Sequence, residues 1–113
     1  MKERKKRVAV LVKETIAEII QNEIRDPRLG FLTVTGVEMS TDLKKARVFF
    51  SVLGPEKERE RSEEVLQKAR GFIRHQLARK ISLKYIPEIE FEIDQLVLQE
   101  RRVEEILKRL KEE

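Results

Sequence analysis

The fold is decided by residues 62–94, whose sequence is SEEVLQKARGFIRHQLARKISLKYIPEIEFEID. As far as Ile81, the apolar side chains recur at the three- and four-residue spacing of a helix, and Ser62 is a candidate N-cap. Residues 88–94 instead alternate strictly between apolar and acidic side chains, which predicts a strand with one buried and one wet face. A long helix followed by such a strand is typical of a layered α+β domain.

Gly71 interrupts the helical pattern near its middle. A glycine inside a helix costs about 1 kcal/mol relative to alanine, and glycine is one of the few residues at which helices bend sharply. On a straight helix, the apolar side chains from Val65 to Ile81 would spread over roughly 180°. We therefore expect a kink at Ala69, Arg70 and Gly71, so that each half of the helix buries its own apolar stripe.

Three elements are predicted before this stretch and one after it. Residues 4–25 have the spacing of an amphipathic helix that Asp26 and Pro27 terminate. Residues 31–39 and 46–53 are rich in β-branched and apolar side chains, and the short connection between them predicts an antiparallel pair of strands. Residues 98–111 have the pattern of a last amphipathic helix.

The predicted order is α-β-β-α-kink-α-β-α, a three-stranded sheet with helices on one face. The 113 residues suit one domain spanning residues 1–113. Gly36, inside the first predicted strand, indicates a bulge or a close approach of another backbone. Phe49 falls out of phase with the buried face of its strand, in a position where it could pack under the last helix.

The composition excludes several classes of protein. The chain has no cysteine, which excludes disulfides and thiolate-bound metals, and no apolar run approaches the ~18 residues of a membrane span. The basic start MKERKKR is followed by only five apolar residues and no cleavage site, so we expect a cytoplasmic rather than a secreted protein. Residues 1–7 carry five Lys or Arg and one Glu, which accounts for the whole net charge of +4.

One segment of the chain body is strongly basic. From Lys68 to Lys84 there are six Lys or Arg residues and His75, with no carboxylate. A charge run of this kind is either a solvated helix face or a site for a phosphate backbone. The missing acids favour the second interpretation, because the rest of the chain alternates its charges. The small side chains of Ala69 and Gly71 would let an RNA backbone approach the kink.

We predict three basic groups as RNA contacts. The first is the segment just described, with Arg70, Arg74, Arg79 and Lys80 as the main phosphate contacts. The second is a basic arm over residues 1–7, and the third lies at the turn between the two predicted strands, beside Arg47. The predicted RNA-binding residues are Lys2, Arg4, Lys5, Lys6, Arg7, Lys44, Lys45, Lys68, Arg70, Arg74, Arg79, Lys80 and Lys84.

We find no pattern that indicates catalysis, a cofactor or a metal. His75 is the only histidine and lies among cations, and no Ser or Thr has a recognisable His and Asp partner set. The four glycines are scattered and form no phosphate-binding loop. The carboxylates of residues 88–94 form one acidic strand face, which is more simply a solvated surface than a metal site. We therefore expect a binding protein and not an enzyme.

The chain resembles the bacterial ribosome-binding factor A family over nearly its whole length. Four stretches carry the resemblance: IRDPRLGFLTVTGVEMS (24–40), DLKKARVFFSVLG (42–54), LQKARGFIRHQLARKISLKYIPEIEFEID (66–94) and ERRVEEILKRL (100–110). One departure follows Asp94, where members commonly have a small polar segment and this chain has QLVLQ at residues 95–99.

The resemblance implies a KH-like fold of type II topology, in which Ala69-Arg70-Gly71 replaces the usual nucleotide-gripping loop. It also implies a monomeric assembly factor that binds the small (30S) ribosomal subunit. Such a factor promotes late maturation and processing of 16S rRNA, especially in the cold, with a functional link to assembly GTPases. The alternative that the residues leave open is a protein-interaction module that dimerises through its terminal amphipathic helices.

Overall fold

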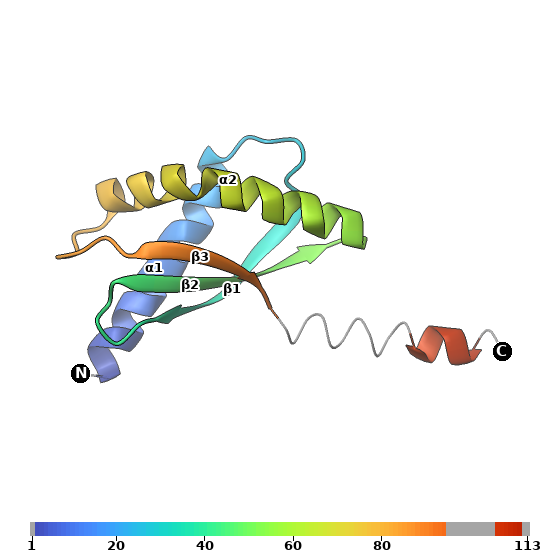
Figure 1. Cartoon of the computed structure of the whole chain (residues 1–113), viewed down its shortest axis with the longest axis horizontal. Helices are drawn as coiled ribbons and strands as arrows, with labels where there is room; N and C mark the ends of the chain where they lie inside the picture. Colours follow the sequence, from blue (N-terminus) through green and yellow to red (C-terminus); the bar gives the residue numbers. More distant parts are fainter. Residues whose placement is uncertain (1, 95–105, 112–113) are drawn as a thin grey trace.

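A computed structural model describes residues 2–94 and 106–111. Helix α1 covers Lys2–Glu23, and strands β1 (Phe31–Met39) and β2 (Lys45–Leu53) follow it. Helix α2 (Glu56–Lys80) then leads to strand β3 (Glu88–Ile93) (Figure 1). Residues 106–111 are helical, so they are the described part of the last helix predicted over 98–111, while the linker at 95–99 lies outside the described residues.

The three strands form one sheet in the order β1-β2-β3. Strands β1 and β2 are antiparallel, as predicted, and backbone hydrogen bonds hold their short connection. The Leu43 N–H donates to the Ser40 carbonyl (2.9 Å), and the Ser40 N–H donates to the Lys45 carbonyl (2.9 Å). Strand β3 runs parallel to β2, with Lys45 opposite Glu88 and Phe50 opposite Ile93. The predicted α+β class with a three-stranded sheet is confirmed.

The bulge predicted near Gly36 is present. The register between β1 and β2 shifts between Val34 and Gly36, which leaves Thr35 as the extra residue. Without the shift, Gly36 and Glu38 would share the face of Val34, because side chains alternate along a strand. With the shift, Val37 and Met39 lie opposite Val48 and Ala46 on the helix-facing side. The bulge therefore keeps Leu32, Val34, Val37 and Met39 of β1 on the helix-facing side.

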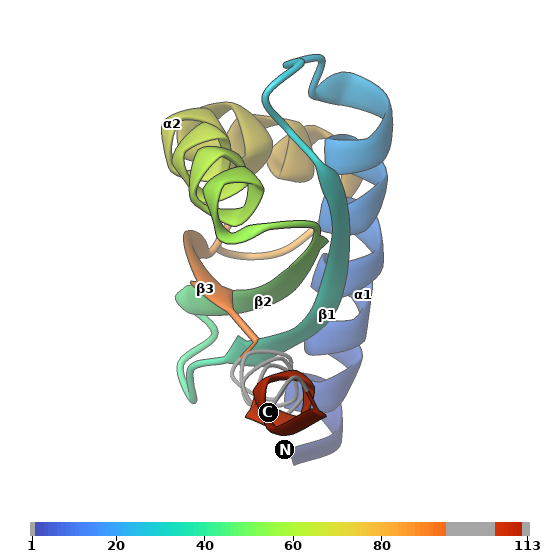
Figure 2. The same cartoon turned by 90° about the vertical axis from the view of Figure 1, so that its right-hand side faces the viewer.

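Both long helices lie on one face of the sheet (Figure 2). Helix α1 packs mainly against β1, and α2 packs against β2 and β3. The rings of Phe50 and Phe91 meet edge to face in the centre, with centroids 6.3 Å apart. The core side chains from the two strands beneath α2 are Ala46, Val48, Phe50, Val52, Ile89 and Phe91, all less than 5% exposed.

Helix α2 begins earlier than predicted. Its first residue is Glu56, directly after the extended Pro55, whose fixed φ suits the start of a helix. Glu56 and Glu58 lie in the first turn, where the helix dipole favours negative charge. Ser62 is therefore not an N-cap but a fully buried residue inside the helix, and its Oγ accepts a hydrogen bond from the Gly30 N–H at 3.0 Å.

Helix α2 runs as one helix from Glu56 to Lys80, so Gly71 does not divide it into two, and a bend at Ala69, Arg70 and Gly71 stays a prediction. Two apolar residues that widened the predicted stripe are not part of it. Phe72 is 44% exposed, and Ile81 lies just beyond the helix end. The remaining stripe from Val65 to Leu77 spans roughly 120°, which a straight helix can bury.

None of the helices in the described part of the chain combines the length and apolarity needed for a membrane span.

We expect Ser62→Ala to lower the free energy of unfolding by about 1–3 kcal/mol, because the Gly30 N–H would lose its partner in a part-buried place. Urea unfolding followed by circular dichroism measures this effect. Ser82→Ala, at an exposed serine after α2, is the matched control and should change stability by less than about 0.5 kcal/mol. Equal effects of the two substitutions would show that the Ser62 hydrogen bond does not stabilise the fold.

Candidate nucleic-acid interface

The first basic group forms the beginning of α1. The sequence placed the helix start near residue 4, but the structure begins it at Lys2, so the basic arm is helical. Arg7 pairs with Glu3 at 3.8 Å, and both side chains are more than 80% exposed. Arg4 and Lys6 are exposed, and Lys5 is half-buried. Helical geometry fixes the spacing of these cations, whereas an extended arm would leave it variable.

The second group, on α2, contains no acid in its own sequence, but two of its cations pair with acidic residues from outside the segment. Lys68 pairs with Glu64 at 3.0 Å, and Lys80 pairs with Glu23 of α1 at 3.7 Å. Both carboxylates lie outside the acid-free segment, so the sequence count of that segment could not reveal them. The Lys68 ammonium lowers the pKa of Glu64 through their hydrogen bond. Two of the six predicted cations are thus partly neutralised within the fold.

Arg74 has a structural role that the sequence did not predict. Its Nε donates to the Pro87 carbonyl at 3.2 Å, and its Nη2 donates to the Ile86 carbonyl at 2.9 Å. These two bonds tie the middle of α2 to the segment that enters β3. Because they use part of the guanidinium, Arg74 is a weaker candidate for a phosphate contact than Arg70 or Arg79.

Arg70 and Arg79 are exposed, and neither forms an ion pair with any residue in the described ranges. They lie on α2 on either side of its buried stripe. Gly71 between them is also exposed, and a Cβ built on it would meet no atom within 4 Å. This part of α2 therefore presents two available guanidinium groups and a stretch of open backbone.

The third group lies next to the end of the second. The Lys44 carbonyl accepts a hydrogen bond from the Glu88 N–H at 2.8 Å, which holds the β1–β2 turn beside the start of β3. The Lys44 and Lys84 ammonium nitrogens lie 5.4 and 5.6 Å from the ring centroid of Tyr85, both within cation–π range. The structure thus brings together Lys44 and Lys84, which are forty positions apart, around an aromatic ring that is 53% exposed.

A shallow hollow of about 360 Å³ lies between the end of α1 and the middle of α2. Arg25 and Lys68 lie at its edge, and Ala69 and Phe72 line its α2 side. Phe72 falls within the apolar stripe predicted from Val65 to Ile81, but its ring is exposed and available for stacking. The spacing of Phe72 in the sequence is that of a buried residue, so the sequence pattern could not identify it as exposed. Only the three-dimensional structure shows that the core is filled without this ring.

Asp26 and Arg28 close the connection between α1 and β1. The Asp26 carboxylate accepts hydrogen bonds from the Arg28 backbone N–H (2.9 Å), Nε (3.1 Å) and Nη2 (2.8 Å). The side-chain hydrogen bonds from Arg28 lower the pKa of Asp26 to about 2. This pair is a structural turn rather than a binding group, and it leaves Arg25 as the available cation of the connection.

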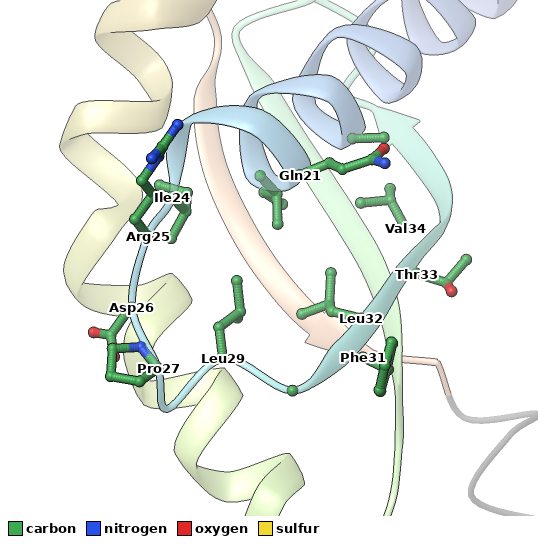
Figure 3. Close-up of a pocket in the computed structure, with 13 residues that line it drawn as sticks. Gln21, Ile24, Arg25, Asp26, Pro27, Leu29, Phe31, Leu32, Thr33 and Val34 are labelled. Carbon is green, nitrogen blue, oxygen red and sulfur yellow. The ribbon is translucent and has the colours of Figure 1, made fainter.

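A second hollow, about 790 Å³, lies between the last turns of α1, the connection after it and the beginning of β1 (Figure 3). Apolar side chains line its floor, among them Ile24, Leu29 and Leu32. No cluster of three potential metal ligands occurs among the residues that the structure describes. This hollow thus has the chemistry of an apolar contact surface. The chemistry of an RNA interface lies elsewhere, in the cations of α2 and in the exposed rings of Phe72 and Tyr85.

The lowered pKa of Asp26 predicts a pH dependence of stability. A carboxyl whose pKa is about 2 in the folded state and about 3.9 in the unfolded state stabilises the fold above pH 4 and loses that contribution as the pH falls toward 2. We expect Asp26→Asn to remove this part of the dependence. Denaturant midpoints of the natural chain and the variant, measured from pH 2 to 6, should therefore converge toward pH 2. A constant difference at every pH would contradict the assignment, and Glu60→Gln, at an exposed helix residue, is the control.

Comparison with known proteins bears out the resemblance. A family model described as ribosome-binding factor A matches residues 4–107. The ribosome-binding factor A of Halothermothrix orenii is 45% identical over 112 residues, which cover 99% of this chain and 92% of that protein. The crystal structure of the factor from Thermus thermophilus superposes with a TM-score of 0.71 at 30% identity, covering 79% of this chain and 93% of that one.

A homology model of the Thermus thermophilus factor, fitted into a cryo-EM map of a complex of the 30S subunit with that factor, gives a TM-score of 0.64 at 31% identity. It covers 74% of this chain and 88% of that chain. These neighbours are consistent with the expected KH-like architecture. From the family match and the identity over nearly the whole length, this chain belongs to the ribosome-binding factor A family.

Proposed function

We propose that this protein binds the small ribosomal subunit by docking on its 16S rRNA, and that it promotes late maturation and processing of that RNA without catalysing a reaction. The observation that carries the proposal is the set of exposed cations on α2 and around Tyr85, flanked by the open backbone at Gly71. The related Thermus thermophilus protein, fitted into a map of a 30S complex, supports the small subunit as the partner.

The binding energy would come mainly from phosphate contacts. Each Lys or Arg that neutralises a phosphate releases counterions, so affinity falls steeply as salt rises. Arg70 and Arg79 are the strongest candidates because the described part of the chain gives them no ion partner. Phe72 and Tyr85 add surfaces on which unpaired bases can stack, which is the usual way that proteins recognise single-stranded RNA.

Docking of this kind would hold an rRNA segment in an immature placement until the subunit is ready. Such a role needs no cofactor or metal, and it places the protein in the cytoplasm with the subunits it binds. Cold would increase the need for it, because misplaced RNA helices rearrange more slowly at low temperature. Release from the mature subunit would be the step at which an assembly GTPase acts.

The alternative of a module that dimerises through its terminal helices loses part of its surface in the fold. The apolar stripe of α1 is buried in the core, with Val12, Ile16 and Ile19 fully buried. Only Val10 and Leu11 remain as exposed large apolar side chains on this helix. These features leave α1 little apolar surface for a dimer contact, and they favour a monomer in which this helix is not an interface between two chains.

The charge-reversed pair Arg70→Glu and Arg79→Glu tests the site. We expect it to weaken binding to 30S precursors at least tenfold at moderate salt and to lower the slope of log K against log salt by about 1 for each lost contact. Sedimentation of the protein with purified precursors at several salt concentrations measures both. The matched control is Lys57→Glu and Arg61→Glu, two exposed cations in the first part of the same helix, which should change binding far less. Equal losses in the two variants would mean that only overall charge matters.

The substitution Gly71→Ala is expected to change the stability of the fold and the binding of the subunit in opposite directions. Because the added methyl meets no atom within 4 Å and the helix is continuous, the variant should be more stable by about 0.5–1 kcal/mol. The same methyl would stand where an RNA backbone approaches, so we expect weaker subunit binding. Ala78→Gly, at an exposed position of α2, is the reciprocal control and should lose stability while keeping its binding. A destabilised Gly71→Ala variant would show that the helix needs a bend at this residue.

A further inference from the structure

The outer face of the sheet, opposite α1 and α2, is apolar at one end. Phe31 and Leu53 lie opposite each other on β1 and β2 and are 83% and 72% exposed. Phe49 lies on the same face and is half-buried. We call these three side chains the outer patch. Two large apolar side chains exposed to this degree and paired across strands mark a contact surface rather than a scattered surface residue.

Residues 106–111 provide a second apolar surface of the same chain. They form a helix whose Ile106, Leu107 and Leu110 are 55%, 54% and 63% exposed. At about 100° per residue, these three side chains occupy an arc of roughly 100°. Such a stripe is the part of an amphipathic helix that packs against another element. The helix and the outer patch thus have complementary chemistry.

The chain leaves the sheet at the end where the outer patch lies. Strand β3 ends at Ile93, which is paired with Phe50 of β2, and the Asp94 N–H donates to the Phe50 carbonyl at 2.8 Å. Leu53 is three residues further along β2 in the same direction. With the predicted helix beginning at residue 98, three linking residues at roughly 3.3 Å each and eight helical residues at about 1.5 Å each span about 22 Å, which exceeds the three-residue step of about 10 Å from Phe50 to Leu53. The helix at 106–111 can therefore reach the patch within one molecule.

Charge complementarity supports the same pairing. Besides its apolar stripe, the helix carries Lys108, Arg109 and Lys111. The adjoining outer face of β3 carries three exposed acids, Glu88, Glu90 and Glu92, of which Glu92 pairs with Arg47 at 3.7 Å. Glu92 is opposite Phe49 of the patch, so a basic amphipathic helix lying over the patch would have its cations nearest to this carboxylate. Each exposed pair adds less than about 1 kcal/mol, so the charges orient the helix and the apolar side chains hold it.

We propose that the C-terminal helix packs over the outer patch of its own chain, with Leu107 and Leu110 against Phe31 and Leu53. This adds a third layer to the fold, on the side of the sheet away from α2. The RNA-facing cations stay uncovered in this arrangement, so the proposal is independent of the proposed function. It also explains why Phe49, an aromatic residue, occupies a strand position on the outer face.

An engineered disulfide tests the proposal, because the natural chain contains no cysteine. The variant carries Leu53→Cys and Leu107→Cys, both at exposed positions outside the core, so folding should be preserved. Under mild oxidation at low micromolar concentration, we expect an intramolecular bond that forms at a rate independent of protein concentration. Non-reducing electrophoresis and mass spectrometry distinguish it from a bond between two chains.

The control replaces Leu53→Cys by His75→Cys, at an exposed residue of α2, and keeps Leu107→Cys. We expect this pair to react at least tenfold more slowly. Adding Leu110→Asp to the Leu53 pair should slow its reaction about tenfold as well, whereas adding Lys111→Gln should change it less than threefold. Equal rates for the Leu53 and His75 pairs would overturn the proposal. So would a bond found only between two chains, since the occupant would then be a second copy.

Discussion

The parallel pairing of β2 with β3 is the constraint on which the rest of the structure depends. Two parallel neighbours cannot be joined by a tight turn, so the chain must return along the whole sheet before β3 begins. Helix α2 makes this return with 25 residues, about 37 Å of helix against strands of nine residues or fewer. Its length, its position over β2 and β3, and its direction all follow from this crossover.

The same helix must therefore serve two environments at once. Its inner stripe fills the core above Phe50 and Phe91, while its outer surface carries the cations and the open backbone of Gly71. Long-range partners then adjust the outer surface: Glu23 engages Lys80, and the carbonyls before β3 engage Arg74. The fold thus determines which cations remain available for RNA. These are fewer than the Lys and Arg residues in the basic segment from Lys68 to Lys84.

Local sequence patterns were sufficient to predict the helices and strands. They were not sufficient to predict which residues lie together at the candidate RNA interface. Strand β3 follows from apolar alternation, β1 follows from its β-branched and apolar residues, and the bulge follows from a glycine inside a strand, because these signals lie within a few residues of one another. The apolar stripe from which a bend at Gly71 was expected included Phe72, which is exposed, and Ile81, which lies just beyond the helix end, and burial depends on what packs above a side chain. Tyr85 was missed for a related reason, since only the sheet register brings Lys44 to the ring beside Lys84.

The crossover also has a consequence for the time course of folding. The β1–β2 hairpin joins neighbours along the chain, so it can form early and locally. Its pairing with β3 joins residues roughly forty positions apart, such as Lys45 and Glu88, and must await the ordering of everything between them. During synthesis, β3 also emerges after β1, β2 and α2. We expect closure of this last strand to set the folding rate, and the cations around Tyr85 to assemble only at that moment.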